Sequence, residues 1–194
     1  MTRVPRAQSD TKAEIQAAAL DLFARKGFEK TSLREIAERL GITKAALYYH
    51  FPSKNELLRS LVEPLEQDMG GLFAEYGDEP GEAPEGMSDR ARELLGDYFD
   101  ICVRHSTLLV AVLNDVGSLA DIGLIDAVVA WRRRLDRLLV GPGHGTPARM
   151  GAVIALGGIQ DISVMLSAEE ALAYRERALD IALAALAAGI SSKD

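Results

Sequence analysis

Five side chains within residues 44–54 have the chemistry needed to hold a nucleic acid. They are hydrogen-bond donors or aromatics, namely Lys44, Tyr48, Tyr49, His50 and Lys54. Lysine, histidine and tyrosine can donate to phosphate oxygens, and lysine can also donate to guanine in the major groove. Their concentration in one short segment predicts contact with DNA.

The segment TSLREIAERLGITKAALYYHFPSK, residues 31–54, predicts the helix-turn-helix that would present these side chains. Ala37 is small enough to let two helices approach, Gly41 permits a left-handed turn between them, and Leu47 would anchor the second helix in the core. The second helix is expected from an N-cap at Thr43 to about His50, because the Phe-Pro pair that follows disfavours helix.

The charge of the chain is divided unevenly. The whole chain of 194 residues has a formal net charge of -7. Residues 1–62 contain 11 Lys and Arg against 7 Asp and Glu, whereas residues 63–194 contain 11 against 22. A basic N-terminal part attached to an acidic remainder is compatible with DNA binding by one end, although solvated charged faces can produce the same asymmetry by chance.

The rest of the chain also reads as helices, so the predicted fold class is all-α, with no alternating strand pattern and no internal repeat. Capping boxes of the form S/T-x-x-E are expected at residues 11–14, 32–35, 53–56 and 167–170. Pro64 lies inside the helix that follows Ser53 and is expected to kink or break it. Further helices are expected over about 12–26, 33–40, 89–105, 108–119, 122–140, 148–166 and 169–189, with Thr146 as an N-cap and a linker at 77–87.

The sequence gives little evidence for a secreted protein, a membrane protein, a metal-binding protein or an enzyme. One cysteine rules out an internal disulfide, and the N-terminus has no apolar core of a signal peptide. No uncharged apolar run reaches the ~18 residues that span a bilayer, so a cytoplasmic protein is expected. His50, His105 and His144 lack metal-ligand spacing, and Cys102 with His105 lacks a third group to orient a nucleophilic pair. We expect no catalytic residue, no metal and no cofactor.

Several motifs with fixed spacing resemble the DNA-binding domain of the tetracycline-repressor (TetR) family of bacterial transcriptional regulators. They are A-x-x-L-F-x-x-x-G-F at residues 18–28, T-S-L-R-E-I-A at 31–37, L-G-I-T-K-A-A-L-Y-Y-H-F at 40–51 and S-K-x-E-L-L at 53–58. The resemblance covers residues 11–61, about a quarter of the chain. It implies a helix-turn-helix DNA-binding domain over residues 1–62 and a larger helical ligand-binding and dimerisation domain over residues 63–194.

The resemblance also implies a role for each residue of the motif. Hydroxyl and backbone groups at two helix starts would contact phosphates, and Tyr49, His50 and Lys54 would hold the DNA backbone. Lys44 would donate to guanine, and Ala45 would touch a thymine methyl group. The complete predicted DNA-contact set is Thr31, Ser32, Thr43, Lys44, Ala45, Tyr48, Tyr49, His50 and Lys54.

A homodimer on a palindromic operator is expected, because one short recognition helix makes few contacts. The last two helices are the candidate interface, since a helix that is apolar nearly all round must be covered on both sides. The resemblance implies the same, and the alternative is an ordinary core within one chain. The predicted interface residues are Val153, Ile154, Gly157, Gly158, Ile162, Met165, Leu179, Leu183 and Leu186.

The middle helices are expected to hold a small apolar or partly cationic effector, as the resemblance implies. Apolar side chains at helical spacing are more often core than pocket. The Arg132-Arg133-Arg134 run with Arg137 could bind phosphate, but its place opposite the apolar stripe favours a solvated face. The predicted pocket residues are Phe73, Tyr98, Phe99, Cys102, Leu109, Leu113, Val116, Trp131 and Ile159.

The expected mechanism is a repressor that the effector releases from DNA through a shift of the helix containing Pro64. Two alternatives remain open. One is a regulator of the same kind that ignores ligands or activates transcription. The other is a helical interaction module or enzyme in which the helix-turn-helix is incidental.

Overall fold

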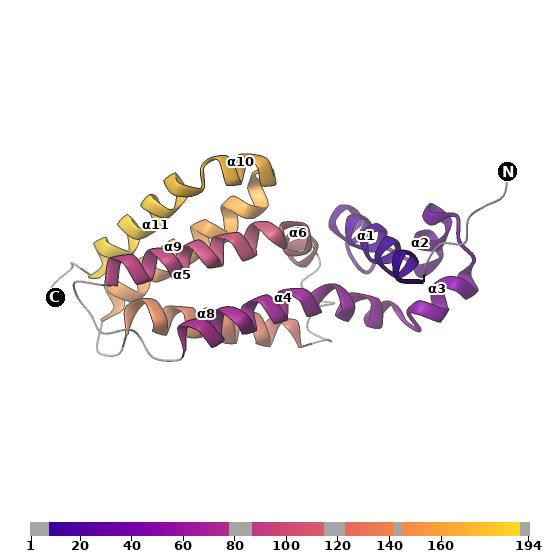
Figure 1. Cartoon of the computed structure of the whole chain (residues 1–194), viewed down its shortest axis with the longest axis horizontal. Coiled ribbons are helices and arrows are strands. Elements are labelled where there is room, and N and C mark those ends of the chain that lie inside the picture. The colour runs from indigo at the N-terminus through magenta and orange to yellow at the C-terminus, as the bar shows by residue number, and fades with distance from the viewer. Residues whose placement is uncertain (1–7, 78–86, 115–122, 142–144, 191–194) are drawn as a thin grey trace. The chain divides into compact units, whose positions relative to one another are not determined.

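The computed structural model describes residues 8–77, 87–114, 123–141 and 145–190, and every regular element among them is an α-helix. The predicted all-α fold class is therefore confirmed. The first helices are α1 (Gln8–Lys26), α2 (Leu33–Leu40), α3 (Lys44–His50) and α4 (Lys54–Tyr76). The others are α5 (Met87–Arg104), α6 (Ser106–Asn114), α8 (Leu124–Val140), α9 (Thr146–Met165), α10 (Ala168–Ala173) and α11 (Arg175–Ile190) (Figure 1).

Most of the predicted helix ends lie within one or two residues of the observed ones, and the capping residues explain why. The Ser32 hydroxyl accepts from the Glu35 amide, and Ser167 and Glu170 form the complete capping box. The capping box predicted at Thr11 is wrong, because α1 begins earlier, at Gln8. The N-cap predicted at Thr146 is also wrong, because Thr146 is already helical and Gly145 precedes it.

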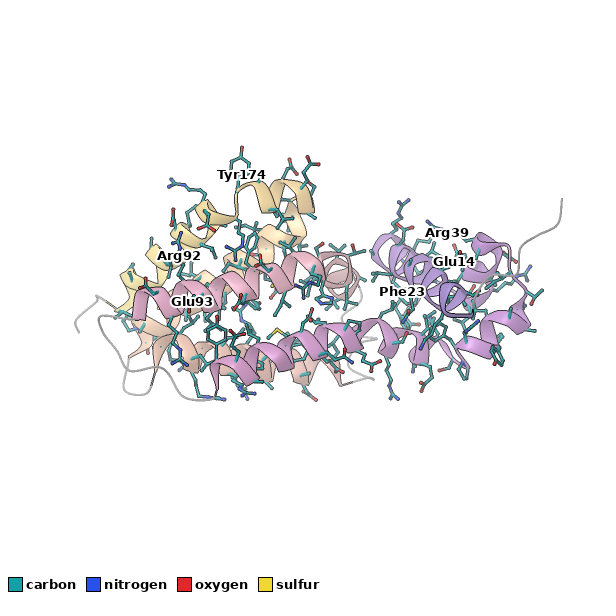
Figure 2. The ribbon with its side chains drawn as sticks, in the orientation of Figure 1. Glu14, Phe23, Arg39, Arg92, Glu93 and Tyr174 are labelled. Atoms are coloured by element: carbon teal, nitrogen blue, oxygen red, sulfur yellow. The ribbon has the colours of Figure 1, made fainter. Side chains whose placement is uncertain are left out.

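The single helix predicted over residues 169–189 is two helices. The interruption lies at Tyr174, which has φ −110° and ψ 17° and ends α10. The side chain of Tyr174 projects from the surface there (Figure 2). No proline or glycine marks this break, so the sequence pattern gave no signal for it.

The contacts divide the chain into two units, one of residues 1–64 with 107–125 and the other of residues 65–106 with 126–194. Along the chain, the boundary between the two units falls within α4, between Pro64 and Leu65. The helix is assigned continuously from Lys54 to Tyr76, so Pro64 does not break it. Among the described helices, none is both long and apolar enough to cross a membrane.

The core of the first unit is formed by apolar side chains spaced three or four residues apart on its helices. Phe23 and Phe28 meet edge to face, with ring centroids 5.1 Å apart. The fully covered side chains of this core include Ile15, Ala19, Phe23, Ile36, Leu47 and Leu57.

The second unit is centred on α5, α9 and α11, which lie side by side (Figure 1). Glycine makes the close approach of α9 and α11 possible. A Cβ atom at Gly151 would lie 2.7 Å from the carbonyl oxygen of Ala185, and one at Gly189 would overlap the carbonyl oxygen of Pro147. Phe99, Leu95, Leu135 and Leu156 are wholly covered within this unit.

Two arginines hold the C-terminal end of α4 in the second unit. Arg90 Nη2 donates to the Tyr76 carbonyl oxygen at 2.7 Å, and Arg134 Nη2 lies 3.3 Å from the Phe73 carbonyl oxygen. The Arg134 guanidinium also lies 4.2 Å from the centroid of the Phe73 ring. Carbonyl groups at a helix end lack partners within the helix, so these contacts satisfy them and fix the helix to α5 and α8.

Candidate nucleic-acid interface

Helix α3 separates one buried anchor from a row of exposed side chains. Leu47 is 0% exposed, and it attaches the helix to the core of the first unit. Lys44 and Ala45 are exposed, as are Tyr48 and Tyr49 one turn later, at 51% and 71%. Residues separated by four positions share a helix face, so these four side chains form one outward surface. We call it the outer face of α3.

The turn before α3 has the geometry predicted for a helix-turn-helix. Gly41 adopts φ 62° and ψ 31°, the left-handed conformation that glycine tolerates best. The amide of Ile42 donates to the carbonyl oxygen of Ala37 at 3.0 Å, which closes the end of α2. Ala37 is buried, as expected for the small residue at the contact between α2 and α3.

The two predicted phosphate-binding hydroxyls at exposed helix starts are Ser32 and Thr43. Ser32 Oγ accepts from the Glu35 amide at 3.1 Å, and Thr43 Oγ1 accepts from the Ala46 amide at 3.1 Å. A hydroxyl that accepts one hydrogen bond still has its own proton to donate. Both caps therefore keep a donor available at the surface.

Thr31 and Lys54 occupy different places from those expected of phosphate contacts. Thr31 is 1% exposed, and its hydroxyl donates to the Gly27 carbonyl oxygen at 2.9 Å. Lys54 Nζ donates to the carbonyl oxygens of Phe28 at 2.8 Å and Thr31 at 3.1 Å. The assignment of the Thr31 hydroxyl to a phosphate is corrected, because burial removes it from solvent. Lys54 holds the loop between α1 and α2.

His50 ends α3 and is partly exposed beside Tyr49. The two rings meet edge to face, with centroids 5.4 Å apart. This contact restricts the orientation of the imidazole next to the outer face of α3. Lys44, at the other end of the helix, makes no hydrogen bond or ion pair with any described residue.

Several other cations of the first unit are already paired. Arg39 Nη1 lies 2.6 Å from Asp21 Oδ2, and this contact with the Arg39 guanidinium lowers the pKa of that carboxyl. Lys26 pairs with Glu35, and Arg34 pairs with Glu38 at 2.6 Å. These residues stabilise α1 and α2 locally, whereas Lys44 of α3 is exposed and is paired with none of the residues that the structure describes.

The predicted effector-pocket residues fall into separate groups. Phe73, Tyr98, Phe99, Cys102 and Ile159 are buried in the second unit, and Trp131 is partly exposed there. Leu109 and Leu113 belong to the first unit by contacts, and Leu113 is 52% exposed. Val116 lies outside the described residues. Two surface pockets of the second unit are lined by none of the predicted residues.

A small polar cluster nevertheless lies among the buried members of that set. Tyr98 Oη is 3.5 Å from Gln160 Oε1, and burial raises the pKa of the Tyr98 hydroxyl. Burial also raises the pKa of Cys102 to about 12. The thiol is therefore protonated at neutral pH and poorly suited to nucleophilic attack. His105 contacts Asp68, with Nε2 2.7 Å from Oδ2.

The predicted interface residues divide into an outward group and an inward group. Val153, Ile154 and Met165 are 51%, 60% and 76% exposed on α9. Leu179 and Leu186 of α11 are buried within the same chain, at 1% and 3% exposed. Gly158 is exposed, whereas Gly157, Ile162 and Leu183 are intermediate. Met150 and Ile181, which are not among the predicted interface residues, are each 58% exposed and add to the outward apolar surface.

Groups of three or more His, Cys, Asp or Glu side chains with metal-binding geometry do not occur among the residues placed by the structure. His144 lies outside those residues, so its surroundings are not described.

Comparison with known proteins agrees with the helix-turn-helix geometry. Residues 15–61 match the domain of the bacterial regulatory proteins of the tetR family. The chain is 40% identical over 67 residues to the HTH-type transcriptional regulator AcrR of Shigella flexneri, covering 34% of this chain and 31% of that protein. It is 28% identical over 121 residues to the HTH-type transcriptional repressor KstR2 of Mycobacterium tuberculosis, covering 62% and 58%. The chain thus spans only about a third to somewhat over half of these relatives.

The fold of the whole chain is similar to that of a TetR-like transcriptional regulator from Rhodococcus sp. RHA1. The TM-score is 0.69 with 22% sequence identity, and the match covers 98% of this chain and 100% of the other. At that identity the similarity concerns the fold alone.

Proposed function

From the match of residues 15–61 to the tetR family of bacterial regulatory proteins, we propose that this chain is a homodimeric transcriptional repressor that binds a palindromic operator. The observation that carries the proposal is the outer face of α3. Lys44, Ala45, Tyr48 and Tyr49 are exposed on a helix fixed by Leu47 at its inner side and by Thr43 at its start.

Each part of this face has a task in a major groove. Lys44 donates to a base edge or a phosphate, and Ala45 is small enough to contact a thymine methyl group. Tyr48 and Tyr49 supply hydroxyl donors, and His50 adds a ring donor at the helix end. Ser32 and Thr43 donate their hydroxyl protons to phosphates. Lys54 acts indirectly in this proposal, by holding the loop that precedes α2.

A dimer supplies the second half of the operator contact. Met150, Val153 and Ile154 form an exposed apolar surface on α9, and Met165 extends it toward the end of the helix. Among the described residues outside its own turn of helix, nothing lies within 4 Å of the position of a Cβ at Gly158, so a second backbone has room to approach there. Burial of this surface against a second copy would remove apolar side chains from water. The two α3 helices would then lie about 34–36 Å apart, one turn of B-DNA.

The effector of the proposed repressor would act from the second unit. The buried Tyr98 and Cys102, with the partly exposed Gln160, place polar atoms among apolar side chains, an environment that suits a small apolar or partly cationic molecule. Such a ligand lowers DNA affinity only if it binds the released conformation more tightly, by a coupling of about 1–3 kcal/mol. Pro64, directly before the change of contact unit along α4, is the candidate hinge.

Binding to the DNA upstream of the gene tests the proposal directly. Fluorescence anisotropy over a salt series is expected to give tight binding with a slope near −0.9 per phosphate contact. Tyr49→Ala and Lys44→Ala should each weaken binding about tenfold or more, because each removes a donor of the outer face. Arg177→Ala, an exposed change on α11, is the matched control and should leave the affinity unchanged.

The outcomes separate the alternatives. DNA binding that no small molecule releases would favour a ligand-independent regulator. Activation of a reporter gene would mean that the protein is an activator and not a repressor. Equal affinity of the parent protein and both α3 variants would instead favour an incidental helix-turn-helix.

A further inference from the structure

A second, unrelated feature of the molecule is a small pocket between the end of α8 and the start of α9. Its volume is about 290 Å³, and it is lined by Arg133, Asp136, Arg137, Val140, Gly141 and Arg149. The four α8 residues follow the spacing i, i+3, i+4, i+7, which places them on one face of that helix. Arg149 reaches the pocket from the first turns of α9, so cations from two helices converge on one hollow.

The charge of this lining contrasts with that of its surroundings. Three arginines and one aspartate line the pocket, in a part of the chain where acids outnumber bases two to one. Within the described residues, the side chains of Arg133 and Arg137 form no hydrogen bond or ion pair. Arg92, Arg104 and Arg175 of the same unit are each paired with a carboxylate at 2.9 Å or less. Among the described residues, the pocket lining therefore has an excess of positive charge, with three arginines against one aspartate.

Asp136 adds a second observation that points to a missing partner. Its Oδ1 atom is buried and has no hydrogen-bond partner. Burial raises the pKa of this carboxyl, while Arg132 and Arg149 act in the opposite direction. A buried carboxyl oxygen without a partner is costly. A hydrogen-bond donor on a ligand, such as a hydroxyl group, would satisfy it, while an anionic group of the same ligand would accept hydrogen bonds from the arginines.

We propose that the pocket between α8 and α9 binds a small anion through a carboxylate or phosphate group, with Arg137 and Arg149 as the main contacts. The planar guanidinium group matches the geometry of both anions, and paired donors give a short, charge-assisted contact. The volume admits a small organic acid or phosphate ester. Val140 supplies an apolar wall for the carbon part of such a molecule. This site is separate from the buried cluster proposed to hold the effector.

The test is isothermal titration calorimetry on the full chain without DNA, so that its failure leaves the proposed DNA-binding function untouched. Inorganic phosphate and succinate are titrated separately to distinguish the two anion classes, with glycerol as the uncharged comparison. Binding of at least one anion is expected, and Arg137→Gln and Arg149→Gln should each weaken it about tenfold or more. Arg177→Gln, which changes an exposed arginine outside the pocket, should leave it unaltered.

Asp136→Asn supplies an independent check, because the amide keeps the shape of the side chain but cannot carry a negative charge. It should bind the same anion as tightly as the parent protein or more tightly. All the altered arginines are exposed or partly exposed, so the variants are expected to fold, and their melting temperatures without ligand verify this. The proposal is overturned if neither anion binds at about 10 mM, or if Arg137→Gln and Arg149→Gln bind as well as the parent. It is also overturned if these variants change only the oligomeric state, since the pocket would then receive an acidic side chain of a second copy.

Discussion

The ammonium group of Lys54 lies 4.1 Å from the centroid of the Phe28 ring and 2.8 Å from the Phe28 carbonyl oxygen. The same group reaches the Thr31 carbonyl oxygen at 3.1 Å. One cation thus ties the start of α4 to the loop between α1 and α2. A residue that the sequence assigns to a phosphate contact is used to fix the position of α2, and through α2 the turn that leads to α3.

Replacement of Lys54 by Met should therefore lower the stability of the folded protein. Any effect on DNA affinity should follow from the altered position of α2 and not from the loss of a phosphate contact. Methionine keeps the apolar stem but loses the hydrogen bonds to the loop carbonyls. Hydrogen bonds involving a charged group contribute about 1.5–3 kcal/mol, so a decrease of that order in the free energy of unfolding is expected. Urea unfolding followed by circular dichroism measures it.

Lys44→Met is the matched control, since Lys44 is exposed and makes no hydrogen bond to a described residue. It should weaken DNA binding with a change in stability within about 0.5 kcal/mol. If Lys54→Met is as stable as the parent protein but binds DNA more weakly, Lys54 contacts a phosphate, and the structural role argued above is wrong.

The contact of α11 with the start of α9 leaves no room for a side chain at Gly189. A Cβ atom there would overlap the Pro147 carbonyl oxygen and lie 3.1 Å from the Ala148 Cα atom. Because the neighbours are backbone atoms, Gly189→Ala should destabilise the second unit by about 1–3 kcal/mol. Thermal unfolding measures the loss. Gly71→Ala on α4, where nothing lies within 4 Å, should instead raise stability by about 0.5–1 kcal/mol, because alanine favours helix. Equal effects of the two changes would mean that α11 shifts freely on α9.

The sequence predicts best those features that depend on neighbouring residues. Ser32 and Thr43 accept from amides three positions later, and the Gly41 amide donates to carbonyl oxygens three and four positions earlier, so their places follow from local spacing. The outer face of α3 follows from the same spacing once Leu47 is assigned to the core.

Features that depend on distant residues were predicted less well. Lys54 and Phe28 are 26 positions apart, so no local pattern indicates that the lysine is engaged. Leucines at the spacing of Leu179 and Leu186 can face either a second subunit or the core of their own chain. The packing of α11 on α9 and α5 buries both within one chain. The pocket at Arg137 and Arg149 needs two helices to meet, and the arginine run alone suggested only a solvated face.

Asp68 provides a pH-dependent contribution to stability between α4 and α5. His105 Nε2 and Arg104 Nη1 each lie 2.7 Å from Asp68 Oδ2. The hydrogen bond with His105, followed by that with Arg104, lowers the pKa of Asp68 below its usual 3.8 despite partial burial. A carboxyl with a lowered pKa in the folded state stabilises the protein above its unfolded pKa, and this is lost as the pH falls through the folded pKa.

Asp68→Asn should consequently be less stable than the parent protein at pH 5–6, by about 0.5–1.5 kcal/mol. The difference should shrink as the pH falls below 3.8, because the parent carboxyl then becomes neutral as well. Urea unfolding at a series of pH values measures this. Glu66→Gln, an exposed change on the same helix, should show no comparable pH-dependent difference. A difference that stays constant down to pH 2 would indicate that shape rather than charge is responsible.

The exposed and buried apolar residues of α9 and α11 should respond differently to substitution. Ile154 is 60% exposed, so Ile154→Glu leaves the core of the chain intact but places a charge in the proposed dimer interface. A loss of about 2–5 kcal/mol in association is expected, or roughly 30-fold or more in the dimer dissociation constant. Leu186 is 3% exposed, so Leu186→Ala should lower the free energy of unfolding by about 2–5 kcal/mol instead. Sedimentation velocity measures the first effect and chemical unfolding the second. A parent protein that is monomeric at micromolar concentration would contradict the dimer, and a dimer unaffected by Ile154→Glu would place the interface on another surface.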